Sequence, residues 1–136
     1  MQFDTKVALV IRTDLEAWQK LNVAAFLASG VAAAFPECVG EPYADKSGTA
    51  YHALIGQPIL IYDADRPALS RALERALARG VKPAVYTEDM FKTTHDEANR
   101  AAVQAVIRAD LNLVGLAFRA ERKVIDKIVD GLKFHT

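Results

Sequence analysis

The chain has 136 residues, of which 51% are hydrophobic and 25% are charged, and its 17 basic residues balance its 17 acidic ones. This composition excludes a disordered chain and a fibrous repeat, and it predicts one globular domain over residues 1–136. The neutral total argues against nonspecific binding of nucleic acid, which needs a clear positive excess.

The sequence also indicates where the protein works. No apolar run approaches the roughly 20 residues that a membrane span requires, so we expect no membrane insertion. The first residues, Met1 to Lys6, lack the basic and apolar regions of a secretory signal. The single cysteine, Cys38, has no partner for an internal disulfide and suits a reducing compartment. We therefore expect a cytoplasmic protein.

The start of the chain predicts a buried strand followed by a helix. Val7–Ile11 is a continuous apolar run with β-branched residues, which is typical of a strand buried on both faces. Asn22 is a favoured helix cap, and the apolar residues of 23–35 then recur at helical spacing. Trp18 precedes this helix, where it either covers the helix start or marks an interface.

The middle of the chain predicts a hairpin, a second buried strand and a second helix. Asp45–Gly48 is a turn signal within the irregular stretch 36–56, which favours a short hairpin. Ile59–Tyr62 is again a continuous apolar run. Asp65 then caps a helix that Gly80 ends.

The last part of the chain continues this alternation of strands and helices. The expected elements, in chain order, are a strand within 81–86 that starts at Pro83 or lies at a sheet edge, a helix over 95–109 that Thr94 opens with a capping box, a strand over 111–118, and a last helix before Gly131. Strands that alternate with helices predict an α/β fold, built as a three-layer α/β/α sandwich.

Polar residues directly follow the first predicted strand. Arg12 and Asp14 fall at its carboxyl end, where open α/β sheets form crevices and ligand sites. We therefore expect both residues to bind a ligand at the edge of a site. Asp14 has an alternative role, because a short acidic side chain also caps or braces a turn.

The stretch after the third predicted strand is dense in groups able to do chemistry. Glu88 and Asp89 follow the strand, as a general base or a water-orienting carboxylate would. Lys92 offers a cation, and Thr93 and Thr94 offer hydroxyls. The structural alternative is that Thr94 caps the next helix while the acidic residues favour the helix dipole.

We expect neither a metal site nor a cofactor. The three histidines are scattered without the spacing of metal ligands, and Cys38 has no neighbouring cysteine or histidine. The glycines are isolated, so they form neither a phosphate-cradling loop nor a dinucleotide fingerprint.

A set of stretches runs in order through most of the chain: Val7–Leu15, Val23–Ala25, Gly56–Ile61, Ile125–Ile128 and Gly131–Lys133. In these stretches the sequence resembles that of the type 2 peptidyl-tRNA hydrolases. It resembles most closely a bacterial branch of unknown function that shares their fold. The resemblance implies a four-stranded mixed sheet with one antiparallel strand, sandwiched by helices, and often a homodimer.

The hydrolase residues of the first helix are replaced in this chain. Where the hydrolases open that helix with Gly-Lys, the chain has Leu21-Asn22, with Lys20 displaced by two positions. Where they have Gln and His further along the helix, the chain has Phe26 and Ser29. Loss of the lysine would remove charge stabilisation from an active site, unless Lys20 reaches the site instead.

The second hydrolase motif is kept only in part. The Asp-Ala-Gly-x-Thr-Gln loop of those enzymes corresponds to residues 89–94, where Asp89 and Thr93 match and the Gly and Gln are lost. The resemblance therefore implies Asp89 and Thr93 as the catalytic residues, with Lys92 as another substitute for the lost lysine. Binding of tRNA is not expected.

Three functions remain open. The favoured one is a small-ligand-binding or regulatory domain in which the former active site has become a pocket. The expected ligand-binding residues are Arg12, Asp14, Lys20, Asn22, Glu88, Lys92 and Thr94. The alternative is a divergent hydrolase of a peptidyl or aminoacyl ester or a related amide, in which Asp89 orients water and Thr93 binds the carbonyl. The third is protein interaction through homodimerisation along an apolar face.

Overall fold

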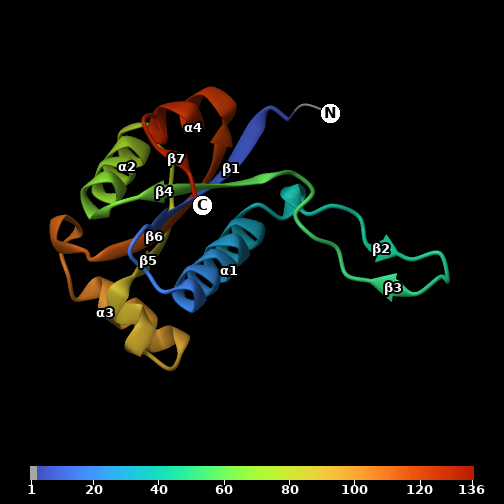
Figure 1. The fold of residues 1–136 in the computed structure, drawn as a ribbon, viewed down its shortest axis with the longest axis horizontal. Coiled ribbons are helices and arrows are strands. Elements are labelled where there is room, and N and C mark those ends of the chain that lie inside the picture. The colour runs from blue at the N-terminus through green and yellow to red at the C-terminus, as the bar shows by residue number, and fades with distance from the viewer. Residues whose placement is uncertain (1–2) are drawn as a thin grey trace.

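A mixed sheet of five strands forms the centre of the fold, in a computed structural model that describes residues 3–136 (Figure 1). The strands pair in the order β5-β6-β1-β4-β7. Their bounds are Thr5–Arg12 for β1, Ile59–Ala64 for β4, Ala84–Thr87 for β5, Leu113–Glu121 for β6 and Lys133–Phe134 for β7. β1 is parallel to β4 and antiparallel to β6, while β5 pairs antiparallel with β6 and β7 antiparallel with β4. The carboxyl ends of β1, β4 and β5 therefore lie at the same end of the sheet.

Within residues 3–136 the structure has four α-helices, and three of them cover the two faces of the sheet. Their bounds are Ala17–Ala34 for α1, Arg66–Ala78 for α2, Asp96–Gln104 for α3 and Arg122–Ile128 for α4. α1 packs on one face, where Val23, Leu27 and Val31 join a buried cluster. α2 and α4 pack on the other face in a second cluster, which includes Leu69 and Ile125. Across residues 3–136, none of the helices combines the length and the apolar character needed to cross a membrane.

The burial of β1 explains why helices are needed on both faces. Val7, Leu9 and Ile11 belong to the cluster under α1, whereas Ala8 and Val10 belong to the cluster under α2 and α4. All five residues are at most 2% exposed. Successive residues of a strand point to opposite faces, so a strand with no polar residue in this run must be covered twice. The prediction of a strand buried on both faces is confirmed.

The sheet has one strand more than the four that the resemblance implies. The four longer strands have the expected pattern, with β6 antiparallel to the other three. β7 adds the fifth strand, because Lys133 pairs with Asp63 and Phe134 with Tyr62. The rings of Tyr62 and Phe134 are stacked with their centroids 5.0 Å apart. A strand of two residues is too short to show a sequence period, so its pairing depends on this tertiary contact.

α1 begins earlier than the sequence predicts. Its first residue is Ala17, so Asn22 lies within the helix and does not cap it. The backbone N–H of Glu16 donates to Gln19 Oε1 at 3.0 Å, which satisfies one of the groups that a helix start leaves open. The predicted cap of the next helix is confirmed, since the Asp65 side chain accepts a backbone hydrogen bond at the start of α2.

α3 also differs from the prediction at both of its ends. His95 precedes its first residue and caps it, because His95 Nδ1 accepts a hydrogen bond from Ala98 N at 3.2 Å. The prediction of Thr94 as the cap is therefore wrong. The helix ends at Gln104, five residues before the predicted end at 109.

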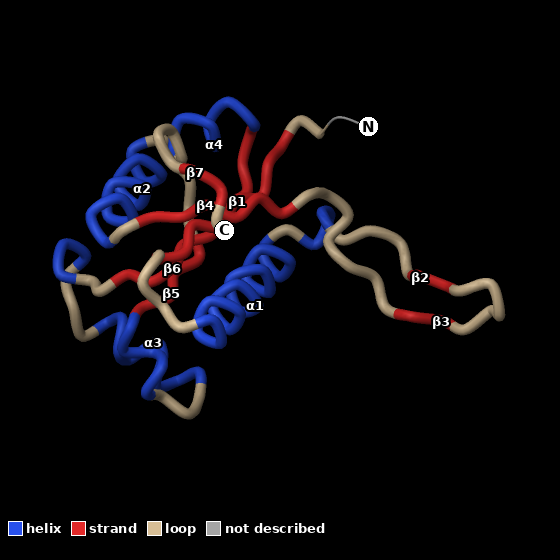
Figure 2. Tube along the Cα trace, viewed as in Figure 1, coloured by secondary structure: helices blue, strands red, loops and turns tan. Residues whose placement is uncertain are grey.

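A hairpin projects from the body of the molecule between α1 and β4 (Figure 1; Figure 2 shows its short strands and long loops). β2 (Tyr43–Ala44) pairs antiparallel with β3 (Ala50–Tyr51), which confirms the predicted hairpin. Residues 40–52 are all exposed. We call residues 40–54 the arm.

Gly115 of β6 faces α1 at a close approach of helix to sheet, and a Cβ atom there would lie 2.6 Å from Val23 Cγ1 and 2.8 Å from Leu27 Cδ1. We expect Gly115→Ala to lower the free energy of unfolding by about 1–3 kcal/mol, because two core side chains must shift. Urea unfolding measures this loss. Gly30→Ala is the matched control, since its Cβ would meet Ala84 Cβ at 3.3 Å. Equal losses in the two variants would contradict the close approach at Gly115.

Candidate functional site

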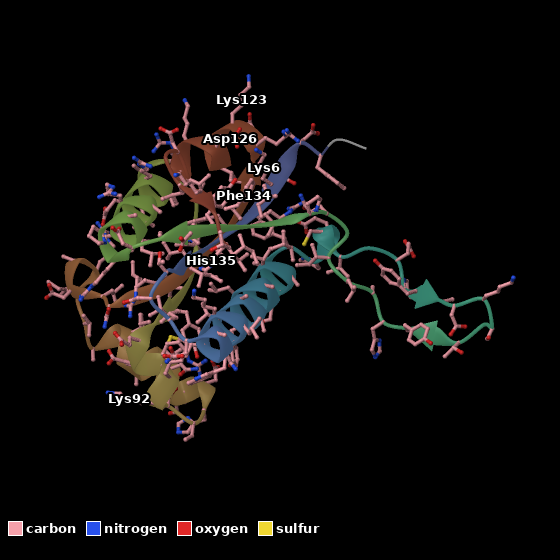
Figure 3. The ribbon with its side chains drawn as sticks, in the orientation of Figure 1. Lys6, Lys92, Lys123, Asp126, Phe134 and His135 are labelled. Atoms are coloured by element: carbon pink, nitrogen blue, oxygen red, sulfur yellow. The ribbon has the colours of Figure 1, made fainter. Side chains whose placement is uncertain are left out.

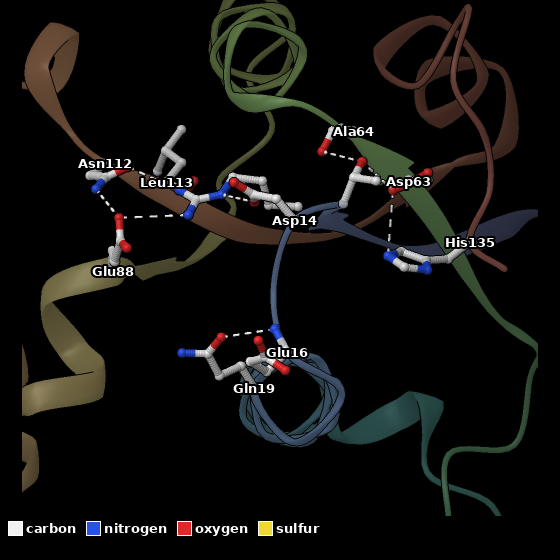
Figure 4. Close-up of polar contacts among 11 residues, drawn as sticks. Asp14, Glu16, Gln19, Asp63, Ala64, Glu88, Asn112, Leu113 and His135 are labelled. Carbon is white, nitrogen blue, oxygen red and sulfur yellow. Dashed lines mark hydrogen bonds and ion pairs between the residues drawn. The ribbon is translucent and has the colours of Figure 1, made fainter.

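Arg12 joins three segments at the carboxyl ends of the parallel strands (Figure 4). Its side chain is only 10% exposed, and Nε donates to Asp14 Oδ1 at 2.6 Å. Nη1 donates to Asn112 Oδ1 at 3.0 Å and to Leu113 O at 3.4 Å. Nη2 lies 3.6 Å from Glu88 Oε2, which also accepts a hydrogen bond from Asn112 Nδ2. A buried charge costs free energy unless it is paired and hydrogen-bonded, and this network pairs Arg12 with two carboxylates and hydrogen-bonds its Nε and Nη1 groups.

A polar hollow of about 310 Å³ opens beside this network, and we call it the Arg12 hollow. Its lining residues are Arg12, Thr13, Asp14, Asp65, Arg66, Glu88 and Asn112. Because the Nε and Nη1 groups of Arg12 are already bound by protein acceptors, its guanidinium holds the two neighbouring carboxylates in place. It does not offer these donors to an anionic ligand.

Arg12 also sets the charge of Asp14. The hydrogen bond from Arg12 holds the pKa of the Asp14 carboxyl below its ordinary value, partly opposed by burial, and the nearby charge of Lys20 acts in the same direction as Arg12. Asp14 therefore stays ionised over a wider pH range than a free aspartate. Its side chain is 71% exposed, so the carboxylate faces solvent as well as Arg12.

A larger hollow of about 520 Å³ lies between α1, β5 and the segment that leads into α3, and we call it the α1 hollow. Its lining residues are Trp18, Asn22, Phe26, Leu27, Ser29, Gly30, Ala84, Val85, Tyr86, Met90, Phe91, Thr93, Thr94, His95, Asp96 and Asn99. Part of this segment, Glu88–Lys92, forms a short 3-10 turn directly after β5. The turn brings the residues that follow it over the exposed side of α1.

Four aromatic rings lie in a row along the α1 hollow. The ring centroids of Trp18 and Phe91 are 5.9 Å apart, those of Phe91 and Tyr86 are 5.3 Å apart, and those of Tyr86 and Phe26 are 5.9 Å apart. Tyr86 is buried, and burial raises the pKa of its hydroxyl, so the hydroxyl stays protonated. Trp18 and Phe26, in contrast, are 59% and 55% exposed.

Polar groups lie at the rim of the α1 hollow. The Thr93 hydroxyl lies 2.9 Å from Met90 O and also contacts Asn99 Oδ1. His95 Nδ1 is occupied by a backbone N–H of α3, so in the neutral ring Nε2 carries the proton and is the donor that remains. Asn22 adds an exposed amide from α1.

The structure divides the predicted site residues between the two hollows. Asn22, Thr93 and Thr94 line the α1 hollow, and Arg12, Asp14 and Glu88 line the Arg12 hollow. Lys20, Asp89 and Lys92 line neither of them. Asp89 and Lys92 are exposed, and Figure 3 shows Lys92 at the outer side of the molecule beside α3. The catalytic roles of Asp89 and Thr93 stay predictions.

Sequence reasoning misses the residues that meet only in the fold. Tyr86, Phe91 and Asn99 give no signal of a site, because each has a local role in a strand, a turn or a helix. Asn112 is a polar residue directly before the apolar run of β6, which is the one pattern that could have drawn attention to it. Its pairing with Arg12 joins residues 100 positions apart.

A second polar contact links β1, β4 and the end of the chain (Figure 4). The Thr13 hydroxyl donates to Asp63 Oδ1 at 2.6 Å, and His135 Nε2 lies 3.5 Å from the same oxygen. The backbone N–H of His135 donates to Ile61 O at 2.9 Å. These contacts attach the residues around β7 to the rest of the sheet.

In the part of the chain that the structure describes, no three side chains of histidine, cysteine, aspartate or glutamate are grouped so as to hold a metal ion. Cys38 is a buried free thiol in the cluster under α1. Its packing among apolar side chains agrees with a role as a small core residue.

Asp14→Asn tests the link between Arg12 and the Asp14 charge. A carboxyl whose folded pKa is lowered stabilises the fold above its unfolded pKa, and this stabilisation is lost as the pH falls through the folded value. We therefore expect the variant to unfold more easily than the parent at pH 7, by less than about 1 kcal/mol because the carboxylate is exposed. The difference should disappear as the pH falls below the lowered pKa of Asp14, where both forms carry an uncharged side chain. Urea unfolding between pH 2 and 7 measures it, and a difference independent of pH would contradict the pairing.

Comparison with known proteins assigns the chain to a family. The family model described as "Protein of unknown function (DUF2000)" matches residues 5–136. The solved structure of the protein of unknown function Atu0240 from Agrobacterium tumefaciens strain C58 is similar, with 45% identity and a TM-score of 0.97 over 99% of this chain and 100% of that one. No match is found among curated proteins. The chain therefore belongs to the DUF2000 family of proteins of unknown function.

Proposed function

We propose that the α1 hollow binds a small ligand that carries a flat aromatic ring, and that this binding is the function of the chain. The observation that carries the proposal is the row of four rings, Trp18, Phe91, Tyr86 and Phe26, along a hollow of about 520 Å³. Small-molecule sites are typically concave and mainly apolar, with volumes of about 300–1,000 Å³ and a few well-placed polar groups.

The polar groups at the rim of the hollow favour a ligand that has hydrogen-bonding atoms at the edge of its ring. A flat ring stacks favourably on exposed aromatic faces such as those of Trp18 and Phe26. The Asn22 amide both donates and accepts, and the remaining N–H of His95 donates. Nucleobases and ring-substituted aromatic acids combine a stacking face with polar edge atoms, so they are the chemical class that this rim favours.

The resemblance to type 2 peptidyl-tRNA hydrolases supports the same location. Asn22, Phe26 and Ser29, which stand where those enzymes have Lys, Gln and His, all line the α1 hollow. Thr93, which matches the second motif, lines it as well. None of these four side chains carries a charge, so they would give an oxyanion no charge stabilisation. We therefore infer that the hollow corresponds to the hydrolase site and has lost its charged groups.

A divergent hydrolase of an ester or amide is the alternative proposal. Its support is Thr93, whose hydroxyl is at the α1 hollow. Asp89, the residue expected to orient water, is exposed and does not line the hollow. We expect no turnover of peptidyl-tRNA or aminoacyl esters by the purified chain. Turnover that disappears in Asp89→Ala would favour the hydrolase instead.

We further propose that the chain acts as one domain in a reducing compartment such as the cytoplasm. The buried free thiol of Cys38 supports this compartment. Helices on both faces of the sheet support the description as a three-layer α/β/α sandwich.

Trp18 is the only tryptophan of the chain and lines the α1 hollow, so its fluorescence reports on binding there. We expect nucleosides or aromatic acids from a metabolite panel to change the Trp18 emission and to raise the melting temperature. Phe26→Ser removes one stacking ring and should weaken the binding about tenfold, since stacking on an aromatic side chain is worth roughly 1–3 kcal/mol.

The matched control for this experiment is Phe134→Ser. Phe134 is 61% exposed, close to the 55% of Phe26, and it lies on β7 rather than at the hollow. This variant loses the stacking on Tyr62, so circular dichroism first establishes that it is folded, and it should then keep the full affinity. A panel without any hit, or an equal loss of affinity in both variants, would contradict the proposed site.

A further inference from the structure

α1 presents an apolar face that stays largely exposed in the structure of residues 3–136. Leu21, Trp18 and Phe26 are 72%, 59% and 55% exposed. The segment Leu21–Ala34 contains no charged residue, although a surface helix normally turns charged and polar side chains to water. Contiguous apolar surface of this kind marks an interaction site.

The arm is a second exposed surface among the described residues. Tyr43 and Tyr51 oppose each other across the hairpin and are 55% and 53% exposed, and Leu54 near the base is 63% exposed. At the base, Gly40 N donates to Leu54 O at 2.9 Å, so both limbs leave the body together. A two-stranded hairpin is at best marginally stable in water, and its open edges are available for pairing.

The tip of the arm is nevertheless well ordered by its own hydrogen bonds. Asp45 Oδ1 accepts from Ser47 N at 2.9 Å and from Thr49 N at 3.0 Å. Asp45 Oδ2 accepts from the Tyr51 hydroxyl at 2.7 Å, and Gly48 takes the positive φ of 84° that closes the turn. A segment that is ordered before binding loses less conformational entropy when it docks.

We propose that two copies of this chain pair about a two-fold axis through the middle of α1, and that the arm of each copy lies over the α1 hollow of the other. In a two-fold contact the same patch meets itself, so the two α1 helices run antiparallel. The arm leaves the body just beyond the C-terminal end of α1 (Figure 1). It therefore reaches the N-terminal half of the partner's α1, where Trp18 and Phe26 line the hollow. This inference rests on the proposed function, because it gives the bound ligand its cover.

The dimensions of the two surfaces match. α1 has 18 residues, so it is about 27 Å long at 1.5 Å per residue. One limb of the arm, from Gly40 to Ser47, extends about 25 Å at roughly 3.3 Å per residue. An arm of this length reaches along most of a helix of this length.

The exposed apolar area is sufficient for a stable dimer. The side chains that would be covered in each copy are Trp18, Leu21, Phe26, Tyr43, Tyr51 and Leu54. Aromatic side chains bury about 150–250 Å² each, so these half-exposed groups offer roughly 600 Å² in each copy. Because every contact occurs twice about the axis, the pair would bury roughly 1,200 Å² in total, which reaches the range of specific interfaces.

Sedimentation of the ligand-free chain at micromolar concentration tests this inference, and we expect a dimer. Leu21→Glu places a charge in the helix contact and should raise the dimer Kd at least about tenfold. Tyr43→Ser removes a ring from the arm while the Tyr51 contact at the tip remains, and it should have the same effect. In both variants acrylamide should quench Trp18 more strongly than in the parent. Ile107→Glu is the matched control, since Ile107 is 69% exposed between α3 and β6, and it should leave the dimer unchanged.

Circular dichroism first establishes that each variant is folded. A parent chain that sediments as a monomer overturns the inference, and so does a dimer that Leu21→Glu leaves intact. A dimer that Leu21→Glu weakens and Tyr43→Ser does not would overturn the role of the arm. The sedimentation needs no ligand, so the two proposals can fail separately. A dimer whose hollow binds no ligand contradicts the proposed function and leaves the dimer inference standing. A monomer that binds a ligand contradicts the dimer inference and leaves the proposed function standing.

Discussion

The removal of β1 from water on both faces is the constraint on which the rest of the fold depends. The run Val7–Ile11 has no polar side chain, so β1 needs helices over each face, and its buried backbone N–H and C=O groups need a strand on each edge. β4 and β6 supply the edges, α1 covers one face, and α2 with α4 covers the other. Because β4 and β5 point the same way as β1, their carboxyl ends gather beside Arg12. The segment after β5 lines both hollows, and the residues after β4 line the Arg12 hollow.

The two hollows differ in chemistry although they share this end of the sheet. In the Arg12 hollow, Arg12 is paired with Asp14 and Glu88, so the network mainly fixes Asp14, Glu88 and Asn112 and ties distant segments together. In the α1 hollow the rings of Trp18 and Phe26 remain half-exposed, and the surface that a ligand would gain is apolar. Burial of apolar surface is the larger source of binding free energy, which is why the proposed function is placed there.

α1 connects the core, the hollow and the arm. Its inner side packs closely on β6 because Gly115 leaves room for Val23 and Leu27, and this sets the distance between helix and sheet. From Leu21 onward its outer side also carries no charge, which a helix in contact with water alone does not require. One apolar helix therefore provides a wall of the core, a wall of the hollow and the face on which a second copy is proposed to pack.

Much of the fold follows from local patterns in the sequence. The apolar runs at Val7–Ile11 and Ile59–Tyr62, the cap Asp65 and the turn Asp45–Gly48 each determine their element through neighbouring residues, and the structure confirms them. The start of α1, the cap of α3 and the strand β7 depend on single side-chain contacts that leave no period in the sequence.

The site could be predicted less well than the fold from the sequence, because its residues come from separate elements. Arg12 and Asn112 are 100 residues apart, and the ring row joins α1 to β5 and to the turn after it. By itself the sequence determined the longer strands, the α-helices and the hairpin turn, since those depend on local spacing. Only the tertiary structure decided that Arg12 is already paired within the protein and that six of the nine predicted site residues divide between two hollows, since burial and hydrogen-bond partners are set by packing.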